Sequence, residues 1–549
     1  MALHPLVASA GRSLREAAAD RLTVDPRALV ALRVALGALI LVDLSLRARW
    51  LGFFYTDAGV LPRTLLLDRY PLAGRLSAHA LFGEVWWTAL LFVAAGVAAT
   101  CLLVGYRTRV AAVCSLLLLA SLHARNPFVL NGGDSLLRRT LLWAVFLPLG
   151  SGLGAWARDA ASTADDRSGV IHPAAVALVL QPVILYGVNA VVKLRGDAWP
   201  SGTAIQMVFS LDSFTVLFGG LLAGSSELLP ILGVGWLVLL CCSPALVVTT
   251  GRARTAAVGL FATAHLGMAL TLGVGLFPAV SVAALLPHLP TEVWDAVERR
   301  SRRASAWVTT RAEAGTLALF GGHLPRLWTA RRPRLEAGGP LCLGPSSLGS
   351  LHDVRTRARA SVLSAEDDRS GPMVGSKWVA GRVSVASIGR VGRVAAAALL
   401  TVVLVWNAAA LGYVDVPDDT DVGVTPESAR WDMFAPYPPD EDVRYVAVGT
   451  LDTGEEVALI ADARESTPTG GLGTGYPSAR WRKYLEVVRW NDDTELRRNL
   501  VSALCSRSAA IGDADRRTER ITLYTVTEST RLGEPEPATW SRVRTHECA

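Results

Sequence analysis

A lysine stands at the end of an apolar segment that is long enough to cross a bilayer. The segment covers about residues 173–192, and Lys193 then opens the loop Lys193-Leu-Arg-Gly-Asp-Ala-Trp199. Most lysines at such positions extend the ammonium to the membrane interface and act as anchors. A lysine that is partly removed from water gives up its proton more easily and can instead serve as a base. The sequence thus supports two hypotheses for Lys193, an interfacial anchor and a catalytic base.

Other polar residues lie inside apolar segments or at their ends. Arg33 and Asp43 fall within the first apolar run, at a spacing that lets them share a helix face without touching. Asp134 and Arg138 open the fourth run, and Asn189 lies near the end of the fifth. Because a charge buried in hydrocarbon is costly, such groups need partners from other helices or a wet cavity. They predict either interhelical ion pairs or a polar pocket.

Three loops on one predicted face carry glycine, proline or asparagine residues that suit tight turns. They are Phe54-Tyr-Thr-Asp-Ala-Gly-Val-Leu-Pro62, which contains Asp57; Asn126-Pro-Phe-Val-Leu-Asn-Gly-Gly-Asp134, which contains Asn131; and the loop from Lys193 to Trp199. Together they predict the lining of a site. Ordinary interfacial loops, with Trp199 as an anchor, are the alternative.

The histidines and cysteines do not have the spacing of a metal site. His123 and His265 are expected to pack in the core or at the interface, and no Walker loop, nucleophile elbow, HExxH or dinucleotide-binding signature is present. Cys505 and Cys548 both fall in the polar C-terminal tail, and they can pair if that tail lies outside the cell.

The elements that must position these residues are membrane helices. Of the 549 residues 51% are hydrophobic and 19% charged, and the mean hydropathy is +0.35, which is typical of a polytopic membrane protein. The net charge of +6 comes mainly from arginines between apolar runs, so it indicates topology and not nucleic-acid binding. The runs predict about eight to nine spans at about 28–46, 84–104, 109–123, 136–150, 173–192, 228–249, 255–273, 275–289 and 394–413.

Arginines occur in alternate connections between these runs, as the positive-inside rule requires. We therefore expect a cell-membrane protein with a cytoplasmic N-terminal segment (1–27), a transmembrane bundle (28–290), a basic cytoplasmic linker (291–393), a last span (394–413) and an extracytoplasmic tail (414–549). The linker is rich in arginine, alanine, glycine and serine, and it is predicted to lie on anionic lipid or to bind a partner.

The tail has the pattern of a small α+β domain. Residues 444–460 alternate apolar and polar side chains around Asp452-Thr-Gly454, which predicts a β-hairpin. Helical spacing follows at 481–488 and 496–504, and 520–527 is typical of another strand. The predicted fold is mainly α, a membrane helix bundle with this small domain at its C-terminal end.

Taken with these features, the chain resembles the HTTM (horizontally transferred transmembrane) domain proteins, which are related to the vitamin K-dependent γ-glutamyl carboxylases. The resemblance begins near Arg33. It rests on the following segments: Phe54 to Pro62, Gly105-Tyr-Arg-Thr-Arg109, Asn131-Gly-Gly-Asp134, Tyr186 to Trp199 and Arg430-Trp-Asp-Met-Phe-Ala-Pro436. It covers most of the chain apart from the basic linker.

The resemblance implies that Lys193 is the base that deprotonates a reduced naphthoquinone of the vitamin K or menaquinol type, with a glutamyl peptide as substrate. One departure is that the carboxylases carry an Asn-His pair where this chain has Asn131-Gly-Gly-Asp134, so that Asp134 either replaces the histidine in part or the reaction differs. A further departure concerns Cys505. Its counterpart is bonded to the first outer loop, which has no cysteine here, and this favours Cys548 as the partner.

Two hypotheses for function therefore stand. One is a quinol-using enzyme with Lys193 as base and a pocket that includes Asp134 and Arg138. The other is a membrane scaffold without enzymatic activity, or a protein that binds quinone or lipid. A transporter would be expected to have repeated halves with broken helices, and the sequence has no such repeat.

Overall fold

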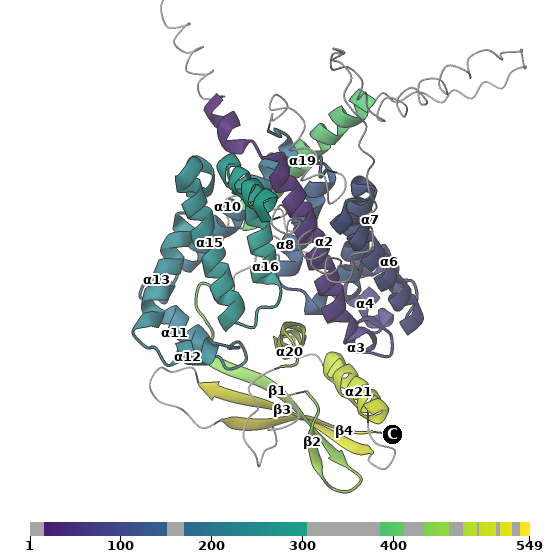
Figure 1. Ribbon diagram of the computed structural model, residues 1–549. Coiled ribbons are helices and arrows are strands. Elements are labelled where there is room, and N and C mark those ends of the chain that lie inside the picture. Colours follow the sequence, from purple (N-terminus) through teal and green to yellow (C-terminus); the bar gives the residue numbers. More distant parts are fainter. Residues whose placement is uncertain are drawn as a thin grey trace, which may run out of the picture. The chain divides into compact units, whose positions relative to one another are not determined.

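The computed structural model describes residues 16–150, 169–304, 385–410, 433–460, 476–490, 494–511, 517–529 and 538–548 (Figure 1). Residues 1–298 and 389–549 form one compact unit. Most of the predicted basic linker lies outside the described residues, as does the start of the N-terminal segment. The site discussed below lies within the compact unit.

Four helices of the described part are long and apolar enough to cross a membrane. They are α2 (Pro26–Ala48), α6 (Val85–Val104), α7 (Thr108–Arg125) and α10 (Pro173–Lys193), and each coincides closely with a predicted run. Local sequence signals explain where α2 begins and where α6 ends. The side chain of Asp25 caps α2 just before Pro26, and Gly105, with φ of +83°, ends α6 in the left-handed conformation that favours glycine.

The remaining predicted runs form helices that do not meet these criteria, so the predicted number of eight to nine spans is not confirmed. They correspond to α8 (Gly132–Val145), α13 (Leu228–Cys241), α15 (Gly251–Thr271), α16 (Phe277–Leu285) and α19 (Val385–Ala410). The run 228–249 is interrupted after Cys241, and α14 (Ala245–Val248) follows Pro244 because proline cannot continue the hydrogen bonding of the preceding helix. Short elements connect the long ones: α3 (Leu51–Tyr55), α4 (Arg63–Arg69), α5 (Pro71–Leu76), η1 (Ala78–Ala80), η2 (Pro127–Val129), α11 (Thr203–Phe209), α12 (Gly219–Ala223) and η3 (Leu286–His288).

Close helix packing fixes the first part of the bundle. Helix α2 packs along α6, and a Cβ atom at Gly37 would lie only 2.8 Å from the backbone of Leu103. Next to this contact, Arg33 is fully buried and donates from Nη1 to the carbonyl of Leu102 at 3.2 Å. Arg33 therefore takes part in the α2–α6 contact through a hydrogen bond to the backbone.

The tail contains a four-stranded antiparallel sheet with the order β2-β1-β3-β4 (Figure 1). Its strands are β1 (Glu441–Leu451), β2 (Glu456–Ala458), β3 (Thr518–Ser529) and β4 (Thr539–Glu547). The predicted hairpin is present as β1 and β2, and Gly454 supplies the positive φ of +80° that its turn requires. The predicted strand 520–527 is part of β3, whereas the sequence pattern did not predict β4.

Two helices complete the tail at the predicted places, α20 (Ala479–Trp490) and α21 (Thr494–Ile511). Helix α21 packs against β3 and β4, and a disulfide joins Cys505 on α21 to Cys548 directly after β4. The pairing that the sequence favoured for these cysteines is confirmed. Helix α20 contacts η2 of the helix bundle, so this helix brings tail residues to the bundle.

Candidate functional site

A buried network of charged residues joins the bundle to the tail. Arg47 on α2 donates from Nε to Asp43 Oδ2 and from Nη2 to Asp134 Oδ1, both at 2.7 Å, and from Nη1 to the Tyr55 hydroxyl at 2.7 Å. Arg480 on α20 binds the same two carboxylates. It contacts Asp43 Oδ1, and its Nη2 and Nη1 lie 3.1 and 3.2 Å from Asp134 Oδ1 and Oδ2. Two guanidinium groups thus balance two carboxylates that are almost fully buried.

Asp134 is held in place by the start of its own helix. The Asn131 side chain accepts hydrogen bonds from the amides of Gly133 and Asp134, and Asp134 Oδ2 accepts from the Asn131 amide at 2.9 Å. This reciprocal arrangement is a capping box. Gly133 is required because a Cβ atom there would lie 2.8 Å from the backbone of Phe277. Since both Asp134 oxygens already accept from an arginine or a backbone amide, the geometry does not present Asp134 as a general base.

His123 belongs to the same network. It is buried in the core, where packing in the core or at the interface was expected, but its neighbours include charged side chains. Its Nε2 lies 3.0 Å from Arg47 Nη2 and 3.7 Å from Asp134 Oδ1, and its Nδ1 lies 2.8 Å from Arg138 Nη1. A neutral imidazole accepts at one nitrogen only, so one of the two arginine contacts is not a hydrogen bond.

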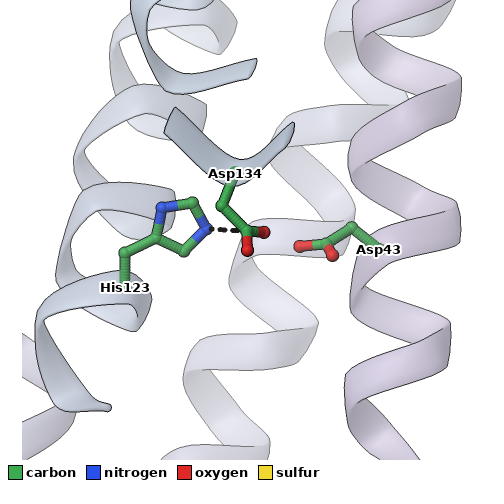
Figure 2. Close-up of side chains that lie close together, drawn as sticks. All are labelled: Asp43, His123 and Asp134. Carbon is green, nitrogen blue, oxygen red and sulfur yellow. Dashed lines mark ion pairs between the residues drawn. The ribbon is translucent and has the colours of Figure 1, made fainter. Parts of the chain in front are cut away.

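Asp43, His123 and Asp134 bring their ligand atoms within 4.8 Å of one another, as in a metal site (Figure 2). However, Arg47 and Arg480 already bind both carboxylates, and Arg47 also contacts the imidazole. A divalent cation at this place would have to displace guanidinium groups or meet their charge at close range. The cluster is therefore best described as an ion-pair network.

Lys193 is buried, with 2% of its surface exposed. Its Nζ donates to the backbone carbonyl of Met433 at 2.7 Å and lies 3.8 Å from the centroid of the Trp199 ring. Trp199 in turn donates from Nε1 to the carbonyl of Phe434 at 2.7 Å. The ammonium therefore holds the 433–434 turn of the chain through contacts typical of a charged lysine, and it does not extend along the surface as an exposed anchor would.

Of the three predicted loops, the first two contact each other, and the third contacts a different part of the chain. Arg125, directly before Asn126, donates to the Leu61 carbonyl at 2.8 Å and lies 3.3 Å from Asp57, while Asn126 donates to the Phe54 carbonyl at 2.8 Å. The first two loops therefore contact each other. The third packs instead on the turn that follows the last apolar helix, since a Cβ atom at Gly196 would lie 2.8 Å from the Pro436 oxygen.

A cavity of about 840 Å³ lies between α8, α10, α19, α20 and the segment 433–445. Helix α10 contributes Ala177, Ile184, Leu185 and Val188, and α19 contributes Leu400, Val403 and Trp406. The opposite elements contribute charged side chains of both signs. They are Arg138 and Arg139 on α8, Arg482, Lys483, Glu486 and Arg489 on α20, and Asp440, Glu441 and Asp442 where β1 begins. The cavity is thus amphipathic, and its volume is within the range of small-molecule sites.

The predicted site residues have different relations to this cavity. Asn131 and Arg138 line it. Asp134 follows Asn131 but takes part in the ion-pair network, and Lys193 and Trp199 lie behind the Met433–Phe434 turn, which itself lines the cavity. Four candidates lie elsewhere: Arg33 on the α2–α6 contact, Asp43 in the ion-pair network, Asp57 beside Arg63, and Asn189, which donates to the Leu185 carbonyl of its own helix.

Sequence reasoning missed Arg47, Arg480 and Arg482. Arg47 follows Asp43 by one helical turn, and this i,i+4 spacing was a signal for their ion pair. No local signal identifies Arg480, because its partners come from distant parts of the chain. Arg482 lies 3.6 Å from the centroid of the Phe214 ring and donates to the Ser213 carbonyl at 3.2 Å. Burial lowers the pKa of Arg482 to about 10, although Glu486 acts to raise it.

Fold and site together define a helical membrane protein in which an ion-pair network and an amphipathic cavity lie where a small α+β domain contacts the bundle. Residues 22–292 match the family model of the HTTM domain. This part of the chain is therefore an HTTM domain. No curated protein and no solved structure matches it.

Proposed function

We propose that this HTTM-family membrane protein binds an amphipathic molecule of the reduced naphthoquinone class in the 840 Å³ cavity. The observation that carries the proposal is the cavity itself, in which an apolar wall from α10 and α19 faces polar and charged groups from α8 and α20. Ala177 and Val188 both line it and lie about 16 Å apart along α10, so the space is elongated. Such a shape suits a ring that carries an isoprenoid tail.

The residues present fit such a molecule. Trp143, Phe277 and Trp406 line the cavity and offer aromatic faces to a ring. Asn131 and Ser135 line it as well and can bind hydroxyl or carbonyl oxygens. Gln181 is less free to do so, because it accepts from Trp143 Nε1 and donates to the Thr140 hydroxyl.

The second part of the proposal is that the protein is an enzyme in which Lys193 acts as a base on the bound molecule. It is supported by the resemblance to the carboxylases and by the position of Lys193 behind the Met433 carbonyl, which borders the cavity. To act as a base, Lys193 must first release a proton and the Met433 oxygen, and Nζ can then take a proton from a bound hydroxyl. When bound, the quinol would be oxidised by O₂, and this oxidation would supply the driving force for removal of the γ-proton of a glutamyl side chain, which then adds CO₂.

A protein that binds quinone or lipid without catalysis is the second candidate. It is favoured because both candidate bases already have partners. The Asp134 carboxylate accepts hydrogen bonds from Arg480 and from the Asn131 amide, and the Lys193 ammonium contacts the Met433 carbonyl and the Trp199 ring. In this case the two residues stabilise the contact of the tail with the bundle. The bilayer is the common partner of both candidates.

Binding and catalysis require separate experiments. For binding, quenching of tryptophan fluorescence by a soluble naphthoquinone is measured for the wild type, for Val188→Trp, which fills the cavity, and for Val97→Trp, which changes a residue that is 58% exposed on α6. We expect weaker binding for Val188→Trp alone. Equal quenching in all three proteins would refute binding in this cavity.

For catalysis, CO₂ incorporation into a glutamyl peptide with a reduced naphthoquinone is compared between the wild type, Lys193→Ala and Arg195→Ala, which changes an exposed residue of the same loop. We expect incorporation by the wild type and Arg195→Ala but not by Lys193→Ala. Wild-type incorporation no greater than that of Lys193→Ala would refute the carboxylase proposal. Naphthoquinone binding would then still be tested by the fluorescence experiment.

A further inference from the structure

The cavity contains an arginine that forms no ion pair with any of the residues that the structure describes. Arg139 on α8 lines the cavity and is half-buried, and no hydrogen bond or ion pair joins its side chain to another residue in the described part of the chain. Its neighbour Arg138 carries the same charge. A guanidinium that is partly removed from water without a counter-charge is destabilising unless a ligand provides one.

Arg138 does not find a full counter-charge either. Its Nη1 lies 2.8 Å from His123 Nδ1, and the nearest carboxylate of that network, Asp134, is already shared by Arg47 and Arg480. A neutral imidazole can accept a hydrogen bond but does not cancel a positive charge. The α8 wall of the cavity therefore has a surplus of positive charge.

The tail contributes Arg482 to the cavity. Arg482 on α20 donates to the Ser213 carbonyl and stacks on Phe214, and neither contact neutralises its charge. The four carboxylates that also line the cavity have other contacts or are exposed. Glu486 pairs with Lys483 at 3.2 Å, Asp442 accepts from the Ser213 hydroxyl at 3.0 Å and lies 3.8 Å from Arg444, and Asp440 and Glu441 are exposed.

We propose that the cavity also binds a second class of ligand, an amphiphile with an anionic headgroup, a phosphate or a carboxylate, which Arg139 and Arg482 bind while its chain lies along α10 and α19. Guanidinium groups suit these anions because they offer several N–H donors in one plane. The inference concerns the same cavity as the proposed function but goes beyond it, because a reduced naphthoquinone is neutral and the ligand inferred here is an anion. It also assigns a role to two arginines.

The test compares ligands that share one acyl chain. Binding of oleoyl lysophosphatidic acid, of mono-oleoylglycerol and of inorganic phosphate to the full-length protein in a nonionic detergent is measured by native mass spectrometry. The proteins are the wild type, Arg139→Gln, Arg482→Gln, the charge-conserving Arg139→Lys, and Arg75→Gln as a matched control with an exposed arginine outside the cavity.

We expect the wild type and Arg75→Gln to bind the phosphate lipid about tenfold or more tightly than the neutral lipid, since a hydrogen bond to a charged group is typically worth that factor. Each glutamine variant should lose most of this preference, and Arg139→Lys should retain part of it. The Cys505–Cys548 disulfide, checked by intact mass, confirms that each variant has folded its tail.

Equal affinity for the two lipids in the wild type would overturn the inference, and so would a preference that both glutamine variants retain. Binding of inorganic phosphate as tightly as the lipid would also overturn it, because the chain would then contribute nothing. In each case quenching by the neutral naphthoquinone still tests the proposed function. If that quenching were also insensitive to Val188→Trp, the proposed function would fail as well.

Discussion

Arg480 is predicted to be the main electrostatic link between the tail and the bundle, and Arg480→Met tests this. The substitution keeps the aliphatic stem but removes the guanidinium, which contacts Asp43 and Asp134 and also donates to the Val129 carbonyl at 3.2 Å. Two buried carboxylates would then share Arg47 alone, and the group of four charges would change from neutral to a net charge of −1.

The size of the effect follows from the burial of these groups. The side chains of Asp43 and Asp134 are 1% and 4% exposed, and that of Arg480 is 12% exposed. Breaking a buried pair by removing one partner typically costs about 3–5 kcal/mol. If that cost appears as local opening of α20, protection of its backbone amides from hydrogen exchange should fall between about a hundredfold and a few thousandfold.

Lys483→Met on the same helix is the matched control. Lys483 pairs with Glu486 at 3.2 Å, but both side chains are about 40% exposed, so the loss should stay below ~1 kcal/mol and reduce protection less than about fivefold. Adding Asp134→Asn to Arg480→Met should restore part of the protection, because it removes the excess negative charge. Equal effects of Arg480→Met and Lys483→Met, or no recovery in the double variant, would refute this account of the contact.

Three other predictions concern the tail. Cys505→Ser opens a loop closed across 43 residues and should lower the stability of the tail by about 4 kcal/mol, so unchanged hydrogen exchange of α21 and β3 would contradict it. Burial raises the pKa of Asp442 above its ordinary value of about 4, so the folded chain holds this proton more tightly and unfolding free energy falls as the pH rises through that window. Asp442→Asn should therefore gain stability relative to the wild type as the pH rises above about 4 in thermal unfolding, and a constant difference would argue against it. A C-terminal tag should be accessible to antibody in intact cells, and labelling only after permeabilisation would refute the outer location of the tail.

Much of the helix and strand content could be predicted from the sequence because its causes are local. Hydropathy identified α2, α6, α7 and α10 to within a few residues, since a helix that crosses lipid must be apolar along its length. Alternation and the Asp452-Thr-Gly454 turn predicted the β1–β2 hairpin for similar reasons. The strand β4 was not predicted, because its partly exposed pattern has no clear alternation and its pairing with β3 is a long-range contact.

The sequence by itself also determined which residues carry unusual burial costs, because a charge within an apolar run must find a partner. It did not determine the partner. Only the tertiary structure brought Arg480 to Asp43 and Asp134, turned Lys193 toward Met433 and Trp199, and placed Arg139 on the wall of a cavity. The physical reason is that a side chain's partner depends on the packing of segments hundreds of residues apart, and hydropathy and periodicity report only on neighbours along the chain.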